Sequence, residues 1–234
     1  MFATATTYIG GILLSLLINN KRTKLPKLWR TLFIVTIAVP QFVSLLLVRN
    51  FFANNGIMNT ICANAGITQW LRDIGAISTS YIPFLSAPGW AHVMIILINI
   101  WIGVPYQMLI ATGVLMNIPS DQLESAKIDG ATGVQTFFRI TLPMLAPVLK
   151  VVLMLAITGA FKDYEAIMVL TNGGPGNRSM VMFLYIYNII FGSAGSTSQP
   201  QIGYGALLSV VAAVIVGIVT GIYLFVSKKL DDVV

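Results

Sequence analysis

Five long apolar stretches, separated by shorter polar gaps, set the pattern of the chain. They cover residues 2–18, 31–48, 91–116, 146–170 and 205–226. A helix needs roughly 20 predominantly apolar residues to cross the hydrocarbon of a bilayer, and each stretch approaches or exceeds that length. The pattern predicts an all-α integral membrane protein with about five transmembrane helices in a single domain over residues 1–234.

The composition agrees with a membrane location. Of the 234 residues, 56% are hydrophobic and only 9% are charged, against about 25% charged in an ordinary soluble domain. The net charge of +6 could suggest nucleic acid, but the basic residues fall in the gaps and not on one stripe with aromatics between them. We therefore expect no nucleic-acid partner. The only cysteine, Cys62, excludes an internal disulfide.

The basic residues of the gaps predict the orientation. Ten lie in the first gap, the third gap and the C-terminus: Lys21, Arg22, Lys24, Lys27, Arg30, Lys127, Arg139, Lys150, Lys228 and Lys229. The other two gaps hold only Arg49, Arg72 and Arg178. Because cytoplasmic loops are enriched in Lys and Arg, residues 117–145 and the C-terminus are expected in the cytoplasm of a multi-pass cell-membrane protein. Residues 50–90 and 171–204 are then outer loops.

This orientation places the N-terminus outside the cell. Met1 begins almost inside the first apolar run, without a charged flank or a signal-peptide pattern. We therefore expect that the natural protein or its relatives carry one more helix upstream, so that the six-helix core lacks its first helix here.

The third gap predicts a two-helix elbow, residues 120–142. Ser120, after Pro119, is an N-cap candidate for a first short helix. Thr132 and Gln135 match a capping box for a second one, and Pro143 is expected to close it before the next span.

The elbow also carries a spaced motif. Glu124-Ser125-Ala126 is followed by three residues, the last of them Asp129, then by Gly130, nine further residues and Ile140-Thr141-Leu142-Pro143. Ala126 and Gly130 are small and four residues apart, so we expect one helical face to let another chain approach closely.

This segment resembles the EAA loop of binding-protein-dependent ABC permeases, whose pattern is Glu-Ala-Ala, three residues, Gly, nine residues and Ile-x-Leu-Pro. The sequence departs from that pattern only at Ser125. The resemblance implies that the loop docks on a separate cytoplasmic ATPase dimer. The coupling residues would be Glu124, Ser125, Ala126, Asp129, Gly130, Ile140, Leu142 and Pro143. The chain has no G-x-x-x-x-G-K-[ST] phosphate loop, so we expect a non-enzymatic subunit without a cofactor, whose partner hydrolyses ATP.

Two further stretches resemble the sugar branch of this family. Asn99-Ile100-Trp101-Ile102-Gly103-Val104-Pro105-Tyr106 and Leu170-Thr171-Asn172-Gly173-Gly174-Pro175-Gly176 look like the first permease subunit of maltose-type importers. The resemblance covers residues 30–229 and implies import of a sugar or oligosaccharide. It also implies a second permease subunit in a heterodimer and an extracytoplasmic solute-binding protein.

The same resemblance implies a substrate pathway of five residues: Asn99, Gly103, Tyr106, Gly159 and Asp163. The first three share a helical face, since they are spaced by four and three, and an aromatic beside polar groups suits a sugar ring. Ala156 and Ala160 stand where the maltose permease has polar side chains, which implies a different sugar.

Alternatives remain open for these residues. Tyr106 could serve only helix packing or an interfacial aromatic belt. Asp163 could line the pathway, or it could form a structural ion cluster with Lys162 and Glu165, because isolated charges inside a membrane are costly. His92 stands without a second ligand, so no metal site is expected.

Rival functions are also open. A permease of the same superfamily could move glycerol phosphate, a peptide or an amino acid. A secondary transporter would show inverted repeats and broken helices, and a membrane enzyme would need a clustered acid–base or metal set. Neither feature is evident in the sequence, so sugar import is the preferred interpretation.

Overall fold

A computed structural model describes residues 2–20, 23–192 and 199–231. The described residues form helices joined by turns and loops, without a β-strand, so the all-α prediction is confirmed. Lys21 and Arg22, and residues 193–198 of the expected second outer loop, lie outside the described residues.

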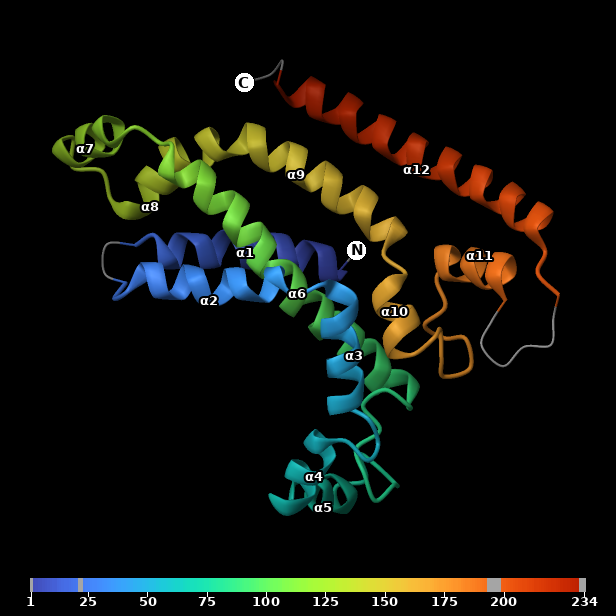
Figure 1. Cartoon of the computed structure of the whole chain (residues 1–234). Coiled ribbons are helices and arrows are strands. Elements are labelled where there is room, and N and C mark those ends of the chain that lie inside the picture. The colour runs from blue at the N-terminus through green and yellow to red at the C-terminus, as the bar shows by residue number, and fades with distance from the viewer. Residues whose placement is uncertain (1, 21–22, 193–198, 232–234) are drawn as a thin grey trace. The chain divides into compact units, whose positions relative to one another are not determined.

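The helices follow one another along the chain as Figure 1 shows. The first six are α1 (Phe2–Ile18), α2 (Pro26–Ala38), α3 (Gln41–Phe51), α4 (Ile57–Asn64), α5 (Ile67–Asp73) and α6 (Pro88–Met116). The others are α7 (Ser120–Ile128), α8 (Gly133–Thr136), the π-helix η1 (Phe137–Thr141), α9 (Leu142–Lys162), α10 (Glu165–Leu170), α11 (Met182–Phe191) and α12 (Ile202–Asp231).

The predicted spans are found with two interruptions. The expected helix over residues 31–48 is divided into α2 and α3 at Val39 and Pro40, because proline cannot donate the backbone hydrogen bond that a continuous helix requires. The expected helix over residues 146–170 is interrupted at Asp163 and Tyr164, between α9 and α10.

The number of full spans is accordingly smaller than expected. Three described helical segments are long and apolar enough to cross a membrane, namely Pro88–Met116, Gly133–Leu170 and Ile202–Lys228, and α2 with α3 adds a fourth if the pair is one broken span. Helix α1 is apolar but has only 17 residues. By length and composition the described chain thus supplies three or four spans, against the five expected.

The chain divides into two compact units. The first unit comprises Met1–Ala38, Ile100–Ala160 and Thr220–Val234, and the second comprises Val39–Asn99 and Phe161–Val219. Each unit is described separately below.

In the first unit, glycines let α1 and α6 approach closely. A methyl group added at Gly103 would lie 2.5 Å from Cγ2 of Thr7, and one added at Gly11 would collide with Gln107. Small residues at such crossings allow close van der Waals packing, which drives helix association in lipid. Two tyrosines fasten α9 to its neighbours: the hydroxyl of Tyr8 donates to the Leu149 carbonyl (2.8 Å), and that of Tyr223 donates to the Lys150 carbonyl (2.6 Å).

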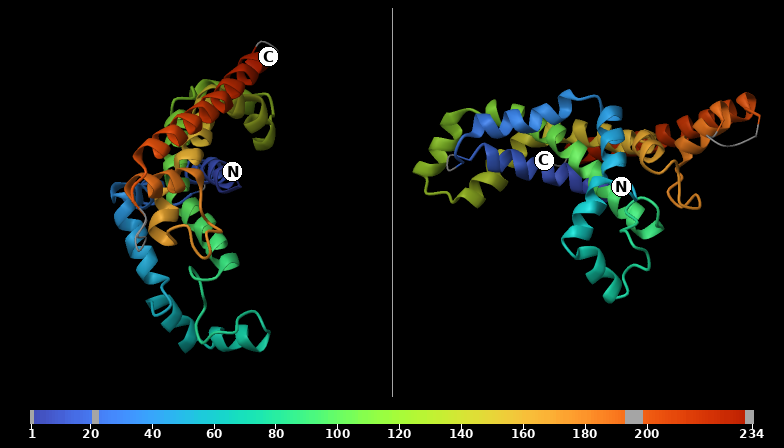
Figure 2. Two further views of the ribbon diagram at one scale, coloured as in Figure 1. Left: turned by 90° about the vertical axis from the view of Figure 1, so that its right-hand side faces the viewer. Right: turned by 60° about the horizontal axis from the view of Figure 1, so that its bottom comes forward.

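In the second unit, α4 and α5 continue from the end of α3, as both views of Figure 2 show. The buried side chain of Asn59 holds this segment together. Its amide donates to the carbonyls of Ala53 and Ile82, each at 3.1 Å, and accepts the Ile82 N–H at 2.8 Å. Elsewhere in this unit, His92 on α6 lies 3.0 Å from the Arg178 carbonyl through Nε2 and 2.7 Å from the Pro88 carbonyl through Nδ1.

Candidate coupling site and substrate pathway

The first helix of the elbow ends in a Schellman motif. The N–H of Ala131 bonds to the carbonyl of Ala126 (2.9 Å), and the N–H of Gly130 bonds to that of Lys127 (3.1 Å). Gly130 has a φ of +76°, in the left-handed region that favours glycine at this position. The glycine of the spaced motif is therefore the residue that turns the chain between the two helices.

The predicted capping box opens the second helix. The N–H of Thr132 donates to Oε1 of Gln135 (2.8 Å), and the N–H of Gln135 donates to Oγ1 of Thr132 (3.3 Å). The expectation that Ser120 caps the first helix is wrong, because the helix already includes Ser120 and its N-cap position is Pro119, without a side-chain cap.

Pro143 does not close the second helix, contrary to expectation. Helices α8, η1 and α9 follow one another without a gap from Gly133 to Lys162. In the π-helical turn the N–H of Leu142 bonds to the Phe137 carbonyl. Because Pro143 lies at the second position of α9, directly after that turn, the change of hydrogen-bond pattern accommodates the missing proline N–H. The elbow therefore passes directly into a long apolar helix.

The elbow exposes charged residues and three large apolar side chains. Ile128 is 86% exposed, Val134 68% and Phe138 60%. Glu124 and Lys127 on α7 and Asp129 directly after it are exposed near Ile128. Ala126 is only 7% exposed and, with Gly130, lines the space between the two arms. The apolar surface available to a partner thus includes side chains of both arms.

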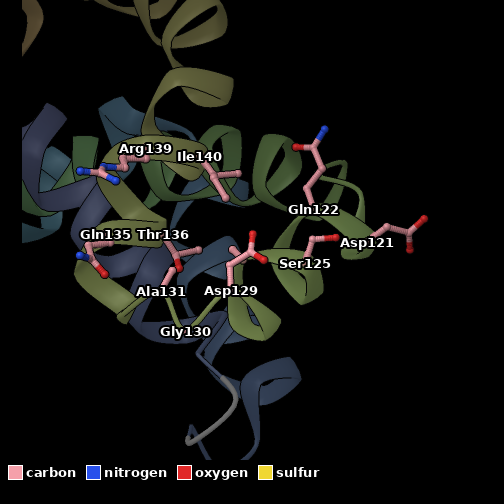
Figure 3. A pocket seen from close by; sticks show the side chains of 11 residues that line it. Asp121, Gln122, Ser125, Asp129, Gly130, Ala131, Gln135, Thr136, Arg139 and Ile140 are labelled. Atoms are coloured by element: carbon pink, nitrogen blue, oxygen red, sulfur yellow. The ribbon is translucent and has the colours of Figure 1, made fainter.

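A cavity of about 720 Å³ lies between the two arms of the elbow. Figure 3 shows Arg139, Gln135 and Thr136 on one arm and Asp121, Gln122 and Ser125 on the other, with the Asp129–Ala131 turn joining them. Ile140 also lines it, and Leu142 is half-buried. Five of the motif residues therefore line a groove between the arms, namely Ser125, Ala126, Asp129, Gly130 and Ile140.

Three expected pathway residues lie on α6. Tyr106 is 52% exposed, and Asn99 is half-buried, with its side-chain amide donating to the Ile95 carbonyl at 3.0 Å. Gly103 backs onto Thr7, as described above. Asn99 belongs to the second unit and the other two to the first.

The remaining two expected pathway residues lie around the end of α9. Gly159, in the first unit, is exposed, and a methyl group added there would meet no atom within 4 Å. Asp163, in the second unit, is half-buried in the two-residue interruption between α9 and α10. Next to it, the ring of Tyr164 lies 5.5 Å from that of Tyr187 on α11. No Lys162–Glu165 ion pair is found in the described part of the chain.

Comparison with known protein families decides the assignment. Residues 9–232 match the model of the binding-protein-dependent transport system inner membrane component family. The chain belongs to this family. It is accordingly a multi-pass membrane protein of the ABC importer permease type, and subunits of this type are not themselves enzymes.

Relatives of this permease are named for sugars. It is 31% identical over 233 residues to the maltodextrin transport system permease protein MdxF of Bacillus subtilis, covering 97% of this chain and 51% of that protein. It is 29% identical over 234 residues to the maltose/maltodextrin transport system permease protein MalF of Vibrio parahaemolyticus, covering 97% and 42%. The chain thus spans about half the length of these relatives.

The fold of the permease matches a solved transporter. A chain in the crystal structure of a bacterial ABC transporter involved in import of the acidic polysaccharide alginate aligns with a TM-score of 0.74 at 24% identity, over 98% of this chain and 78% of that one. A second structure, of that kind of transporter with an alginate pentasaccharide-bound periplasmic protein, aligns with a TM-score of 0.71 at 22% identity, over 98% and 76%. At this identity the likeness concerns the fold.

The permease also contains a polar cluster that the sequence analysis missed. Arg30 on α2 donates through Nη2 to Oδ1 of Asn19, whose Nδ2 donates to the Ser15 carbonyl (2.7 Å) and to Oγ1 of Thr112 on α6 (3.2 Å). Arg30 also reaches Sδ of Met116, the last residue of α6, at 3.7 Å. This cluster joins the α1–α2 turn to the end of α6 just before the elbow. Sequence reasoning used Arg30 only as a loop charge, and no local pattern links it to residues so distant in sequence.

Proposed function

We propose that this chain is the transmembrane permease subunit of an ATP-driven importer that translocates a sugar or oligosaccharide. The observation that carries the proposal is the elbow with its spaced motif, formed as two capped short helices around a left-handed glycine. The maltodextrin and maltose permeases among its relatives favour a carbohydrate over other solutes.

In this proposal the elbow docks on a separate ATPase dimer in the cytoplasm. The large exposed apolar side chains available for the contact are Ile128, Val134 and Phe138. Glu124, Asp129 and Gly130, which are exposed and lie close to Ile128 in the sequence, complete the proposed surface. Because α8 continues through η1 into α9, a displacement of the elbow is carried into a membrane helix without passing through a flexible loop. The proposed coupling residues also include Ser125, Ala126, Ile140, Leu142 and Pro143.

The proposed pathway uses Asn99, Tyr106 and Asp163 as sugar contacts. Gly159 leaves room for the solute, and Gly103 lets α6 pack closely against Thr7. Tyr106 offers an exposed aromatic face for a pyranose ring, and Asp163 lies where the helix is interrupted. Carboxylates and amides supply the acceptors and donors that sugar hydroxyls need.

The proposed assembly contains a second permease subunit and an extracytoplasmic solute-binding protein, with the C-terminus of this chain in the cytoplasm. The experiment that tests the function is sugar uptake by liposomes that contain this chain with the permease, ATPase and binding protein encoded beside it. We expect ATP-dependent uptake of at least one oligosaccharide. Uptake of glycerol phosphate, a peptide or an amino acid but of no sugar would contradict the substrate class.

A further inference from the structure

The short helices α4 and α5 of the second unit present an apolar face to their surroundings. Its members are large side chains at helical spacing that are 43–61% exposed: Ile57, Ile61, Ile67, Trp70 and Ile74. We call this set the α4–α5 apolar face. Ile57 and Ile61 are one turn apart on α4, and the last three follow the spacing of one stripe along α5 and its end.

The exposure of this face does not result from poor packing of the segment that carries it. The side of the two helices that faces the rest of the unit is small or polar, with Asn59, Cys62 and Thr68 buried there. Asn59 makes the three hydrogen bonds described above, and Gly66 and Gly75, each with a φ of +74°, form the turns after the two helices. Ile77, Ile82 and Phe84 of the same segment are buried, but on α4 and α5 themselves the isoleucines and the tryptophan are exposed while Asn59, Cys62 and Thr68 are buried, the reverse of what is expected for helices surrounded by water.

The face continues the apolar surface of α3, which together with α2 forms a candidate broken span. Helix α3 exposes Phe42, Val43 and Leu47. A groove of about 550 Å³ then joins the end of α3 to the start of α4 and is lined by Leu47, Val48, Asn50, Phe51, Asn55, Gly56 and Ile57. Leu47 and Ile57 therefore belong to one apolar surface, so whatever covers α3 in the membrane also reaches α4.

An aromatic series lies at the same level of this unit. Phe51 lies 5.1 Å from Phe52, Phe52 lies 5.3 Å from Phe84, and Phe84 lies 6.0 Å from Trp90 on α6, measured between ring centroids. Tryptophan and tyrosine are enriched where the hydrocarbon meets the headgroups. Trp90 is the member of this series that fits such a place, whereas Phe84 is buried inside the unit.

The charge of the segment favours lipid over a protein partner recognised by charge. Between residues 50 and 90, the only residues that are charged at neutral pH are Arg72 and Asp73, which are adjacent in the sequence. His92 lies outside this segment. Immersion of the exposed isoleucines and Trp70 in the interface would remove apolar surface from water, and membrane binding strengthens with the apolar area buried.

We propose that α4 and α5 form an interfacial hairpin that lies in the lipid headgroup region, with the α4–α5 apolar face toward the acyl chains. The hairpin anchors the segment between α3 and α6 to the bilayer surface, while Asn59, Cys62 and Thr68 stay buried against the rest of the unit and Gln69 and Asp73 remain exposed.

The test places a fluorescent label on single cysteines in the full chain reconstituted in liposomes, with Cys62→Ser as background. Ile61→Cys and Trp70→Cys report on the face. The matched controls are Ala63→Cys and Gln69→Cys. Both positions are exposed, and at 100° per residue each lies more than 90° around its helix from the labelled face position. We expect nitroxide lipids to quench the two face positions about twofold or more over the controls, and aqueous iodide to quench the controls more.

Equal quenching of face and control positions by iodide would overturn the proposal. So would labels on the face that are protected only after the solute-binding protein is added, because the face would then be a protein contact. If the Cys62→Ser background does not fold, a photoreactive residue in place of Trp70 in the otherwise unchanged chain gives the same decision: cross-linking to lipid supports the hairpin, and cross-linking only to protein contradicts it.

Discussion

At the scale of single residues, the glycines of this chain have different roles that their sequence spacing does not reveal. Gly130 turns the chain with a φ of +76°, Gly103 packs against Thr7, and Gly159 has open space around it. The sequence identified all three as functional candidates. It could not separate them, because the backbone angle and the neighbouring helix are properties of the fold.

The backbone conformation at Gly130 is expected to limit which residues can replace this glycine. Gly130→Val should reduce transport at least about tenfold, since a β-branched residue in the left-handed region costs roughly 1–3 kcal/mol and disturbs the Schellman motif. Gly130→Asn should retain most of the activity, because asparagine tolerates this region. Uptake is measured alongside the amount of subunit in the membrane. Equal damage by asparagine and valine would show that space for the partner, and not backbone angle, is limiting.

Gly103 is expected to serve helix packing in addition to the proposed pathway. Gly103→Ala should destabilise the solubilised subunit by about 1–3 kcal/mol, because the new methyl collides with Thr7. Adding Thr7→Ala should restore most of the loss in a thermal unfolding assay. Gly159→Ala, in open space, is the matched control and should leave stability unchanged. A double variant that regains no stability would contradict the packing role.

Tyr106 and Asp163 are expected to affect sugar handling without affecting assembly. Tyr106→Ala should lower uptake by removing a stacking surface. Asp163→Asn should change selectivity among sugars, because an acceptor-only group becomes a mixed donor and acceptor. Uptake of a panel of sugars measures both. Wild-type rates for every sugar in both variants would assign Tyr106 to packing and Asp163 to a structural role.

At the scale of helices, apolar patterning predicted where the membrane segments lie but not where they break. The boundaries of α1 match the first expected stretch, because that run contains no charged residue and is followed directly by Asn19 and Asn20. The break at Pro40 was missed because proline stands inside an apolar run that is otherwise long enough to span. The π-helical turn was missed because hydrogen-bond shifts of one residue leave no mark in hydrophobicity.

The polar cluster at the end of α6 gives a prediction about element packing. Asn19→Leu should destabilise the subunit by about 1–3 kcal/mol, because it leaves the Arg30 guanidinium without its amide acceptor in a half-buried place. Thr112→Val, which removes only one acceptor of the Asn19 amide, should cost less. Thermal unfolding of both variants in detergent checks the order. A larger loss of stability in Thr112→Val than in Asn19→Leu would contradict the proposal that Asn19 is the central residue of the polar cluster.

At the scale of the whole molecule, the sequence predicted the family from about twenty residues, because the spacing of the elbow depends on its geometry and not on its environment. Orientation was inferred from loop charges, some of which lie at Lys21 and Arg22, outside the described residues. The pathway could not be predicted to the same degree. Its residues depend on which helix faces the solute, and several candidates are shared between packing and transport.

The central claim is that the elbow contacts a separate ATPase, and cross-linking at its exposed tip tests this most directly. The photoreactive residue p-benzoylphenylalanine is placed at Ile128, which is 86% exposed, and at Trp70 as a control in another unit of the same assembled transporter. The account predicts that the Ile128 position cross-links to the ATPase subunit on illumination and that the Trp70 position does not. No cross-link from Ile128 to the ATPase in a transporter that remains active would contradict it.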